Sequence, residues 1–373
     1  MNIFLPSLPG MTAHFETEYR VMQLSVAVYL GVSAALQIVI GPLSDKFGRR
    51  PVLLWGLALF VLATLGCLMA PSVEIFLACR MGQAVVAAAM VLSRAAVRDI
   101  YPQDAAASMI GYVTMGMAVV PMVGPALWGA LDEVFGWQAN FWALILLGAL
   151  CFALVWRDMG ETAHASGKTL LQQFREYPEL LTSPRFWGYA MASAFASGAF
   201  FAYLGGAPFV GTEVFGLTPA ALGVYFGAPA LGYILGNFLS GRYSVRFGIN
   251  RMVLWGCLLN AAGLFVSLII FVAGYGTVTS FFAFMTFVGL GNGMTIPNAT
   301  SGMLSVRPHL AGTASGLGGA LMIGGGAALS AVAGALLGPG SGALPLLWLM
   351  FGTAVLGVAA VFVVLLRERQ LDV

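Results

Sequence analysis

The residues best suited to chemistry lie in a short charged stretch, residues 41–51, between two long runs without charge. Asp45 is the only acid there, and it stands among the cations Lys46, Arg49 and Arg50. A carboxylate gains about 0.3–1 kcal/mol beside a helix N-terminus, and more where it is partly buried. The pattern therefore indicates electrostatic chemistry, in which Asp45 pairs with cations or with a helix end.

A second charged candidate, Arg80, lies about two turns inside the apolar run 73–97, and Gln83 follows it at a one-turn spacing. An arginine at such a depth costs roughly 2.5–3.5 kcal/mol on membrane-insertion scales, so something must hold it there. Two interpretations remain open. Either Arg80 faces a central cavity, or its side chain snorkels to the nearer membrane surface.

Other reactive side chains are poorly placed for catalysis. The Asp and Glu residues fall at predicted helix ends or in loops, and the three histidines fall in loops. The four cysteines lie inside apolar runs without metal-ligand or redox spacing, so we predict that they are small buried hydrophobes. No predicted helix combines paired carboxylates, a metal-binding set or a nucleophile with a base. The sequence predicts no enzyme, no metal and no cofactor.

The elements that position these residues are membrane helices, because the composition excludes an ordinary soluble protein. Of 373 residues, 60% are hydrophobic and 9% charged, and the mean hydropathy is +0.90. Fifteen of the 17 Lys and Arg residues, all except Arg20 and Arg80, fall on one predicted face. Lys and Arg in short loops favour the cytoplasmic side, so this face is predicted to be cytoplasmic without any nucleic-acid partner.

The alternation of apolar runs and loops predicts an all-α membrane protein with two halves. Residues 1–157 form the first half, residues 158–185 a cytoplasmic linker, and residues 186–373 the second half. Residues 1–9 are too short to cross the bilayer and are interpreted as the tail of a first helix. The other predicted membrane helices are residues 21–43, 51–70, 73–97, 105–131, 136–156, 186–210, 220–241, 252–273, 278–304, 310–337 and 343–366.

The two halves repeat each other at an offset of 200 residues. The motif Leu54-Trp55-Gly56 returns as Leu254-Trp255-Gly256. The charged stretch returns as well, with Gly41, Ser44, Phe47 and Gly48 matching Gly241, Ser244, Phe247 and Gly248. Val245 stands where the first half has Asp45, so the acidic contact is predicted to occur once.

The pattern Gly41-x-Leu43-x-Asp45-x-x-Gly48-Arg49-Arg50 resembles the signature loop of the major facilitator superfamily. The resemblance implies a fold of two pseudo-symmetric six-helix halves, with helix 1 truncated in this chain and binding at their interface. It also implies that Asp45 sits against a helix of the other half when the cytoplasmic side is closed. We expect Arg98 and Asp99 to join this conformational switch. The simpler alternative is a positively charged cytoplasmic loop and nothing more.

Two further motifs resemble those of the drug-exporting members of this superfamily. Residues 80–84 are similar to a helix 4 motif whose arginine influences proton or substrate binding, with Ala84 in place of a glycine. A predicted bent helix resembles the antiporter motif, which is largely absent from uptake members; its alternative is a helix-packing seam. The antiporter-motif residues are Gly116, Pro121, Gly124, Pro125 and Gly129.

Residues 2–9 resemble the end of helix 1 in the Bcr/CflA drug-resistance branch, where an acid commonly occupies the position of Asn2. About 20 preceding residues of that helix are missing here, through a misplaced start, which we favour, or a truncation. We expect the missing segment to supply the proton carrier and Arg80 to modulate its affinity.

The resemblance implies secondary efflux of lipophilic drugs by proton antiport across the bacterial inner membrane, by a monomer whose linker and C-terminus are cytoplasmic. The predicted cavity residues, besides Arg80 and Gln83, are Tyr29, Gln37, Met115, Tyr203 and Asn292. A facilitator that exports or imports an endogenous metabolite is the main alternative. A membrane enzyme or a non-transporting receptor is a more distant one.

Overall fold

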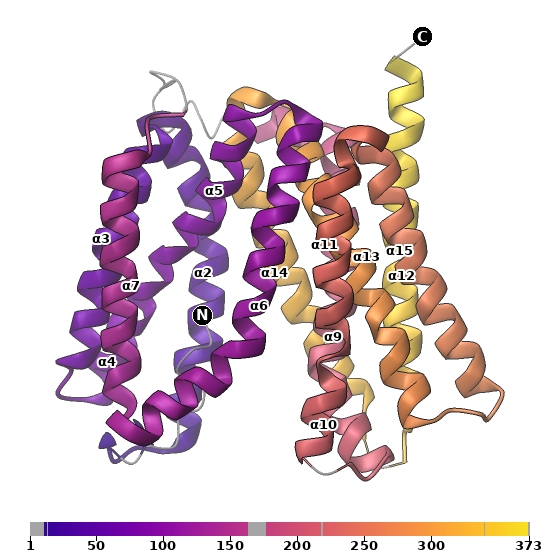
Figure 1. Cartoon of the computed structure of the whole chain (residues 1–373), viewed down its shortest axis with the longest axis horizontal. Coiled ribbons are helices and arrows are strands. Elements are labelled where there is room, and N and C mark those ends of the chain that lie inside the picture. The colour runs from indigo at the N-terminus through magenta and orange to yellow at the C-terminus, as the bar shows by residue number, and fades with distance from the viewer. Residues whose placement is uncertain (1–10, 13, 163–176, 218, 339, 372–373) are drawn as a thin grey trace. The chain divides into compact units, whose positions relative to one another are not determined.

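The computed structural model describes residues 11–12, 14–162, 177–217, 219–338 and 340–371, and in these residues all regular elements are helices (Figure 1). Eight helices of this part are long and apolar enough to cross a membrane. The prediction of an all-helical membrane protein is confirmed. The exposed face of α7 illustrates why, because Trp142, Leu146, Leu150 and Leu154 recur at helical spacing and point outward.

The helices begin and end within a few residues of the predicted runs, since length and hydropathy dominate their formation. In chain order they are α2 (Tyr19–Phe47), α3 (Arg49–Leu68), α4 (Val73–Gly82), η2 (Gln83–Val86), α5 (Ala87–Ile100), α6 (Gln103–Phe135), α7 (Trp137–Asp158), α9 (Pro184–Phe209), η3 (Val210–Val214), α10 (Pro219–Phe226), α11 (Ala228–Phe247), α12 (Ile249–Val272), α13 (Val278–Ser305), η4 (Pro308–Leu310), α14 (Ala311–Leu336) and α15 (Leu344–Leu371).

The structure corrects two details of the predicted helices. The helix predicted over residues 220–241 is divided at Gly227, because Pro229 near the start of α11 lacks the N–H that would continue the ladder. The connection predicted over residues 41–51 is also shorter than expected. The helix α2 runs through Pro42 to Phe47, and Gly48 alone separates it from α3. Asp45 therefore lies in the last turn of a helix and not in a wet loop.

The internal repeat is visible in the backbone. Gly48 follows α2 with φ +94°, and Gly248 follows α11 with φ +78°. Each glycine donates its N–H to the carbonyl of the serine four residues earlier, Ser44 at 3.0 Å and Ser244 at 2.9 Å. A positive φ is accessible to glycine without a steric penalty, so the same residue ends the same helix in both halves.

The chain forms two compact units. Unit 1 contains residues 1–99, 120–175 and 309–317, and unit 2 contains residues 100–119, 176–308 and 318–373. Thus α14 starts in unit 1 and continues in unit 2, whereas α6 starts in unit 2 and continues in unit 1. The division predicted from the sequence, at residues 158–185, remains a prediction.

Unit 2 is built on a close contact between α11 and α13. A side-chain carbon at Gly232 or Gly236 would overlap the backbone of α13, and one at Gly289 or Gly293 would crowd the backbone of α11. Small residues four apart let membrane helices pack backbone to backbone. An apolar core of α9, α12, α13 and α15 side chains, including Tyr203, completes the unit.

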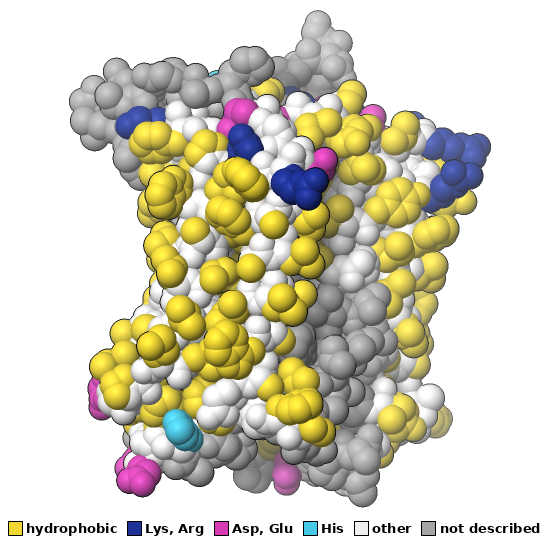
Figure 2. Space-filling model, turned by 60° about the vertical axis from the view of Figure 1, so that its left-hand side comes forward, with side chains coloured by type: hydrophobic (Ala, Val, Ile, Leu, Met, Phe, Trp, Pro, Cys, Tyr) yellow, Lys and Arg dark blue, Asp and Glu magenta, His cyan; other side chains and the backbone are white. Residues whose placement is uncertain are grey.

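In unit 1, α3 packs against α7, α4 and α2. Hydrophobic side chains cover the sides of the helices, and Lys and Arg gather near one end on the face drawn in Figure 2. This distribution places the apolar surface where lipid would lie and the cations at a membrane interface.

Candidate functional site: the Asp45 cap and the Arg80 cluster

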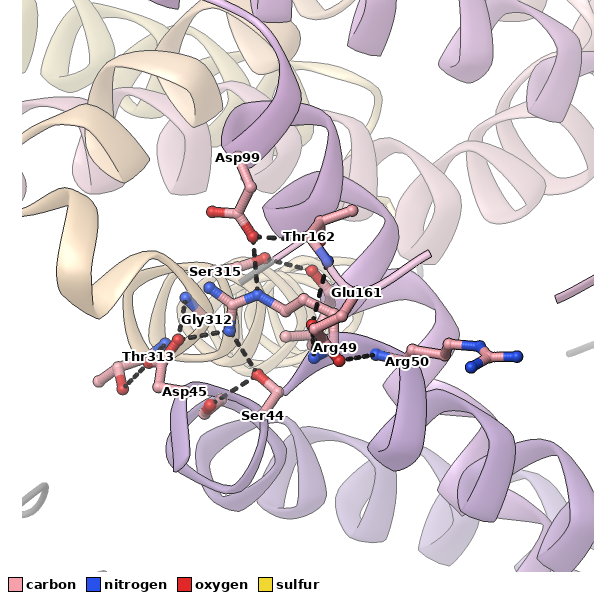
Figure 3. A network of polar contacts seen from close by, with 12 residues as sticks. Ser44, Asp45, Arg49, Arg50, Asp99, Glu161, Thr162, Gly312, Thr313 and Ser315 are labelled. Atoms are coloured by element: carbon pink, nitrogen blue, oxygen red, sulfur yellow. Dashed lines mark hydrogen bonds and ion pairs between the residues drawn. The ribbon is translucent and has the colours of Figure 1, made fainter. Parts of the chain in front are cut away.

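The carboxylate of Asp45 is held at the N-terminus of α14 (Figure 3). Its Oδ1 accepts a hydrogen bond from the backbone N–H of Gly312 at 3.0 Å. Its Oδ2 accepts two from Thr313, from the backbone N–H at 2.9 Å and from the hydroxyl at 2.8 Å. Gly312 and Thr313 are the second and third residues of α14, whose first N–H groups lack partners within the helix. Asp45 therefore caps a helix 267 residues away in sequence.

The charge of Asp45 suits this position, because the N-terminus of a helix carries partial positive charge. Asp45 is 4% exposed, so the helix end and Arg49 replace water as its partners. The family resemblance implies a contact of Asp45 with a helix of the second half, and that assignment of α14 remains a prediction. The role of Asp45 as a conformational switch also remains a prediction.

Arg49 joins the cap to α5. Its guanidinium pairs with Asp45 through Nη1 and with Asp99 through Nε at 3.0 Å. Nη1 also donates to the Ser44 hydroxyl at 2.7 Å, and that hydroxyl donates to the carbonyl of Gly41 at 2.8 Å. Arg49 is only 2% exposed, so two carboxylates balance its charge inside the protein. Removal of either acid would leave a buried charge less well compensated.

Two glycines allow this close approach. A side-chain carbon at Gly41 would overlap the carbonyl of Gly312, so α2 and α14 meet backbone to backbone. A side-chain carbon at Gly312 would overlap the polar atoms of Arg49, Asp45 and Ser44. Any larger residue at position 312 would therefore separate the carboxylate from the helix end that it caps.

Sequence reasoning missed Glu161, which lies just beyond α7. Its Oε1 accepts from the N–H of Arg49 at 2.7 Å and its Oε2 from the N–H of Arg50 at 3.2 Å, so it caps the N-terminus of α3. A side-chain carbon at Gly48 would overlap this carboxylate, which is a second reason for glycine there. An acid after an apolar run was the only signal in the sequence, and it does not reveal which helix the acid caps.

The other charged residues of the predicted switch lie at its edge. Arg50 points outward and donates to the carbonyl of Trp156 at 2.7 Å. Asp99 accepts a second, longer bond from the Thr162 hydroxyl at 3.4 Å. Arg98 is half-buried in the last turn of α5. A role for Arg98 remains a prediction.

Arg80 lies inside unit 1 and is 3% exposed. Its guanidinium carbon is 4.0 Å from the centre of the Tyr29 ring, the geometry of a cation–π contact. Nη1 donates to Gln83 Oε1 at 2.5 Å, and Nε donates to the carbonyl of Ser25 at 3.3 Å. Gln83 in turn donates to the Thr64 hydroxyl at 2.8 Å. These buried partners replace the snorkelling interpretation, which is wrong.

The helix changes character directly after Arg80. The span from Val73 to Ile100 is continuous, but η2 interrupts it as a four-residue 3-10 segment that Gln83 opens. A 3-10 segment inside a longer helix often marks a hinge or a strained sequence. Arg80 and Gln83 therefore combine buried polar contacts with a local irregularity of the backbone.

Comparison with known proteins decides the family. A family model described as Major Facilitator Superfamily matches residues 1–331. The chain belongs to the major facilitator superfamily. It is a multi-pass membrane transporter protein of the bacterial inner membrane, and the resemblance drawn from the Asp45 and Arg80 motifs is confirmed.

Relatives within the superfamily include a drug-resistance protein. The Pseudomonas aeruginosa chloramphenicol resistance protein is 33% identical over 335 residues, covering 86% of this chain and 78% of that one. The Bacillus subtilis MFS-type transporter YdgK is 30% identical over 372 residues, which cover 97% of this chain and 90% of YdgK. The crystal structure of the Escherichia coli fucose:proton symporter FucP matches with a TM-score of 0.78 at 15% identity. The match covers 98% of this chain and 93% of FucP, so the two proteins share the fold.

Among the predicted cavity residues of this superfamily member, Tyr29 is the one that lies beside Arg80. Gln37 and Asn292 are buried, and their Nε2 and Oδ1 atoms have no hydrogen-bond partner in the described part of the chain. Met115 is half-buried on α6. Tyr203 is fully buried, stacks on Phe226 at 5.0 Å between ring centres and donates to its carbonyl at 3.2 Å. That placement favours packing for Tyr203, and the cavity assignments remain predictions.

Two groups of predicted residues escape a structural test. Asn2 lies outside the described residues. At Pro121, Gly124, Pro125 and Gly129 the structure describes the backbone alone. The backbone of α6 is helical through all four positions, and Gly116 is exposed. The bend predicted for this antiporter motif remains a prediction.

The Glu161 cap gives a first testable result. We expect Glu161→Gln to lower the free energy of unfolding by about 1–2 kcal/mol, because a neutral amide loses both the charge at the α3 N-terminus and one acceptor oxygen. Thermal unfolding of the purified protein measures the change. The control is Glu179→Gln, since Glu179 is half exposed and pairs with exposed Arg307 at 3.5 Å. Equal effects of both substitutions would contradict a capping role.

Proposed function

We propose that the chain exports lipophilic drugs by proton antiport, through a cycle in which a central site faces the two sides of the membrane in turn. The chloramphenicol resistance protein that resembles the chain over most of its length supports the substrate class. The Gly-Pro pattern of residues 116–129, similar to the antiporter motif, supports export over uptake.

The cap on α14 is the observation that carries the proposal. The first residues of α14 are bound to α2 through Asp45, whereas the rest of the helix belongs to unit 2. The bond to the helix end is non-covalent and can be broken and remade, as a transporter with two alternating states requires. In this cycle the Asp45 cap stabilises the state that is closed to the cytoplasm.

Arg80 supplies the second element of the proposed mechanism. A buried cation beside Tyr29 and Gln83 attracts anionic or electron-rich groups and disfavours protonation of a neighbouring carboxylate. Substrate contacts are assigned to Tyr29, Gln37, Met115 and Asn292, and Tyr203 is left out because it packs in an apolar core. The proposed transporter is a monomer without catalytic chemistry, in which residues 158–185 and the C-terminus lie in the cytoplasm.

Drug accumulation in intact cells tests the proposal. Expression of the chain in an efflux-deficient bacterium should lower the steady-state amount of radiolabelled chloramphenicol in the cell severalfold, and an uncoupler that dissipates the proton gradient should abolish the difference. Cells that express Asp45→Asn at the same membrane level provide the inactive reference. An unchanged amount of chloramphenicol and of lipophilic dyes, with or without uncoupler, would favour the alternative, a facilitator of an endogenous metabolite.

A further inference from the structure

The helix α2 carries a polar stripe that neither the cap nor the Arg80 cluster explains by itself. Its members recur every fourth residue from one cluster to the other, and all are buried. They are Ser25, Tyr29, Ser33, Gln37, Gly41 and Asp45. We call this set the α2 stripe. Every member lies in unit 1.

The two ends of the α2 stripe face different partners. A four-residue step rotates a helical position by about 40°, so the stripe winds around α2 from one end to the other. At one end the Ser25 carbonyl and the Tyr29 ring contact Arg80. At the other end Gly41 and Asp45 contact the first turn of α14. The stripe thus connects the two candidate sites.

Three polar atoms of the α2 stripe have no hydrogen-bond partner among the residues that the structure describes. They are the hydroxyl oxygens of Ser25 and Ser33 and the Nε2 of Gln37, all in residues at most 2% exposed. Ser33 approaches the Tyr29 side chain, but it makes no hydrogen bond of normal geometry there. Buried polar groups without a protein partner usually bind an ordered water molecule. Each such water makes about three hydrogen bonds.

We propose that the α2 stripe binds a file of water molecules between Arg80 and the N-terminus of α14. Each unpartnered group can serve the file, because a hydroxyl accepts and donates while the Gln37 amide donates. The first two turns of α14 close the far end, since a side-chain carbon at Gly316 would overlap the backbone of Gln37 and one at Gly41 would overlap the carbonyl of Gly312. Exchange of these waters with solvent therefore requires Asp45 to release α14.

The role of this file in transport rests on the proposed function: when α14 leaves, the file supplies water to the Arg80 site. Its existence does not rest on that function. The positive charge of Arg80 opposes the passage of a hydronium ion along the file, so hydration of the stripe need not leak protons.

Hydroxyl-radical labelling by X-ray radiolysis tests the proposal on the full chain in lipid nanodiscs. Radicals formed from bound water oxidise adjacent side chains even where bulk solvent does not reach them. Tyr29 and Tyr203 form a matched pair, because they are 3% and 0% exposed and Tyr203 lies in an apolar core. We expect Tyr29 to be oxidised severalfold faster than Tyr203. Equal, slow rates would overturn the proposal.

Mixing with H2(18)O before irradiation tests the closure by α14. The heavy isotope should enter oxidised Tyr29 slowly in the natural sequence and severalfold faster in Asp45→Asn. The same rate in both would overturn the proposed closure. Neither measurement depends on drug export, so a failed export assay leaves the hydration result intact, and the reverse also holds.

Substitution within the stripe identifies the binding groups. Ser33→Ala combined with Gln37→Leu should reduce oxidation of Tyr29 at least severalfold. Ser267→Ala should not, although it removes a buried hydroxyl on α12 that also has no partner in the described part of the chain. Unchanged oxidation of Tyr29 in a correctly folded double variant would contradict the assignment. The comparison of Tyr29 with Tyr203 in the natural sequence decides the question if the double variant does not fold.

Discussion

Replacement of Asp45 by Asn should lower drug export at least tenfold while the protein still inserts into the membrane. The asparagine side chain has the same shape but carries no charge, and only one of its two polar atoms can accept from the α14 N–H groups. Hydrogen bonds to charged groups contribute about 1.5–3 kcal/mol each. A loss of about 3 kcal/mol would change the ratio of capped to uncapped states by a factor on the order of 100.

Two measurements on Asp45→Asn separate the conformational effect from a loss of protein. Export is followed by chloramphenicol accumulation, and release of α14 by the rate at which a maleimide labels Thr313→Cys in a cysteine-free background. Labelling should be faster when Asn occupies position 45. Glu74→Gln is the control, because it removes an exposed carboxylate in the first turn of α4. Full export by Asp45→Asn would contradict the role of the cap.

Replacement of Arg80 by Lys should also abolish most drug export, although the charge is retained. Lysine cannot stack its head group on Tyr29 or donate in two fixed directions to Gln83 and Ser25. We expect at least a tenfold loss, again measured as chloramphenicol accumulation at matched membrane levels. The ammonium group of lysine is a compact charge on a flexible chain, so it would not reproduce the contacts of Arg80 with Tyr29, Gln83 and Ser25.

Arg80→Met shows whether this arginine is kept for stability. A buried charge pays a large desolvation cost, so its replacement by an apolar side chain of similar length is often neutral or stabilising. We expect the midpoint of thermal unfolding of Arg80→Met to stay within a few degrees of the natural sequence while export is lost. Retained export together with a large drop in that midpoint would mean that Arg80 only supports the fold.

Comparison of the two repeats shows why the second half needs no capping acid at the position of Val245. In the first half Gly41 contacts Gly312, the second residue of α14. The N–H groups there have no partner within the helix and can donate to a carboxylate. In the second half Gly241 lies against α6, and Gly111 makes the equivalent close contact. That glycine is well inside α6, whose N–H groups are already bonded along the helix. A carboxylate at position 245 would find no comparable helix end.

The sequence by itself determined the helices and the family. Hydrophobic runs fix where helices form in a membrane, because every backbone polar group in lipid must be satisfied within its own segment. For the same local reason the sequence identified Gly48 and Asp45, which depend on backbone conformation and charge near a helix end. The sequence also identified Arg80 as a candidate, because a cation inside an apolar run is unusual whatever the direction of its side chain.

Only the tertiary structure decided which partners these residues have. The cap of α14 by Asp45, the cap of α3 by Glu161 and the burial of Tyr203 depend on contacts between residues far apart in the chain. Helical periodicity states which residues share a face but not what that face meets. The α2 stripe is the clearest case, because its spacing is readable in the sequence. That three of its polar atoms have no partner among the described residues is visible only in the tertiary structure.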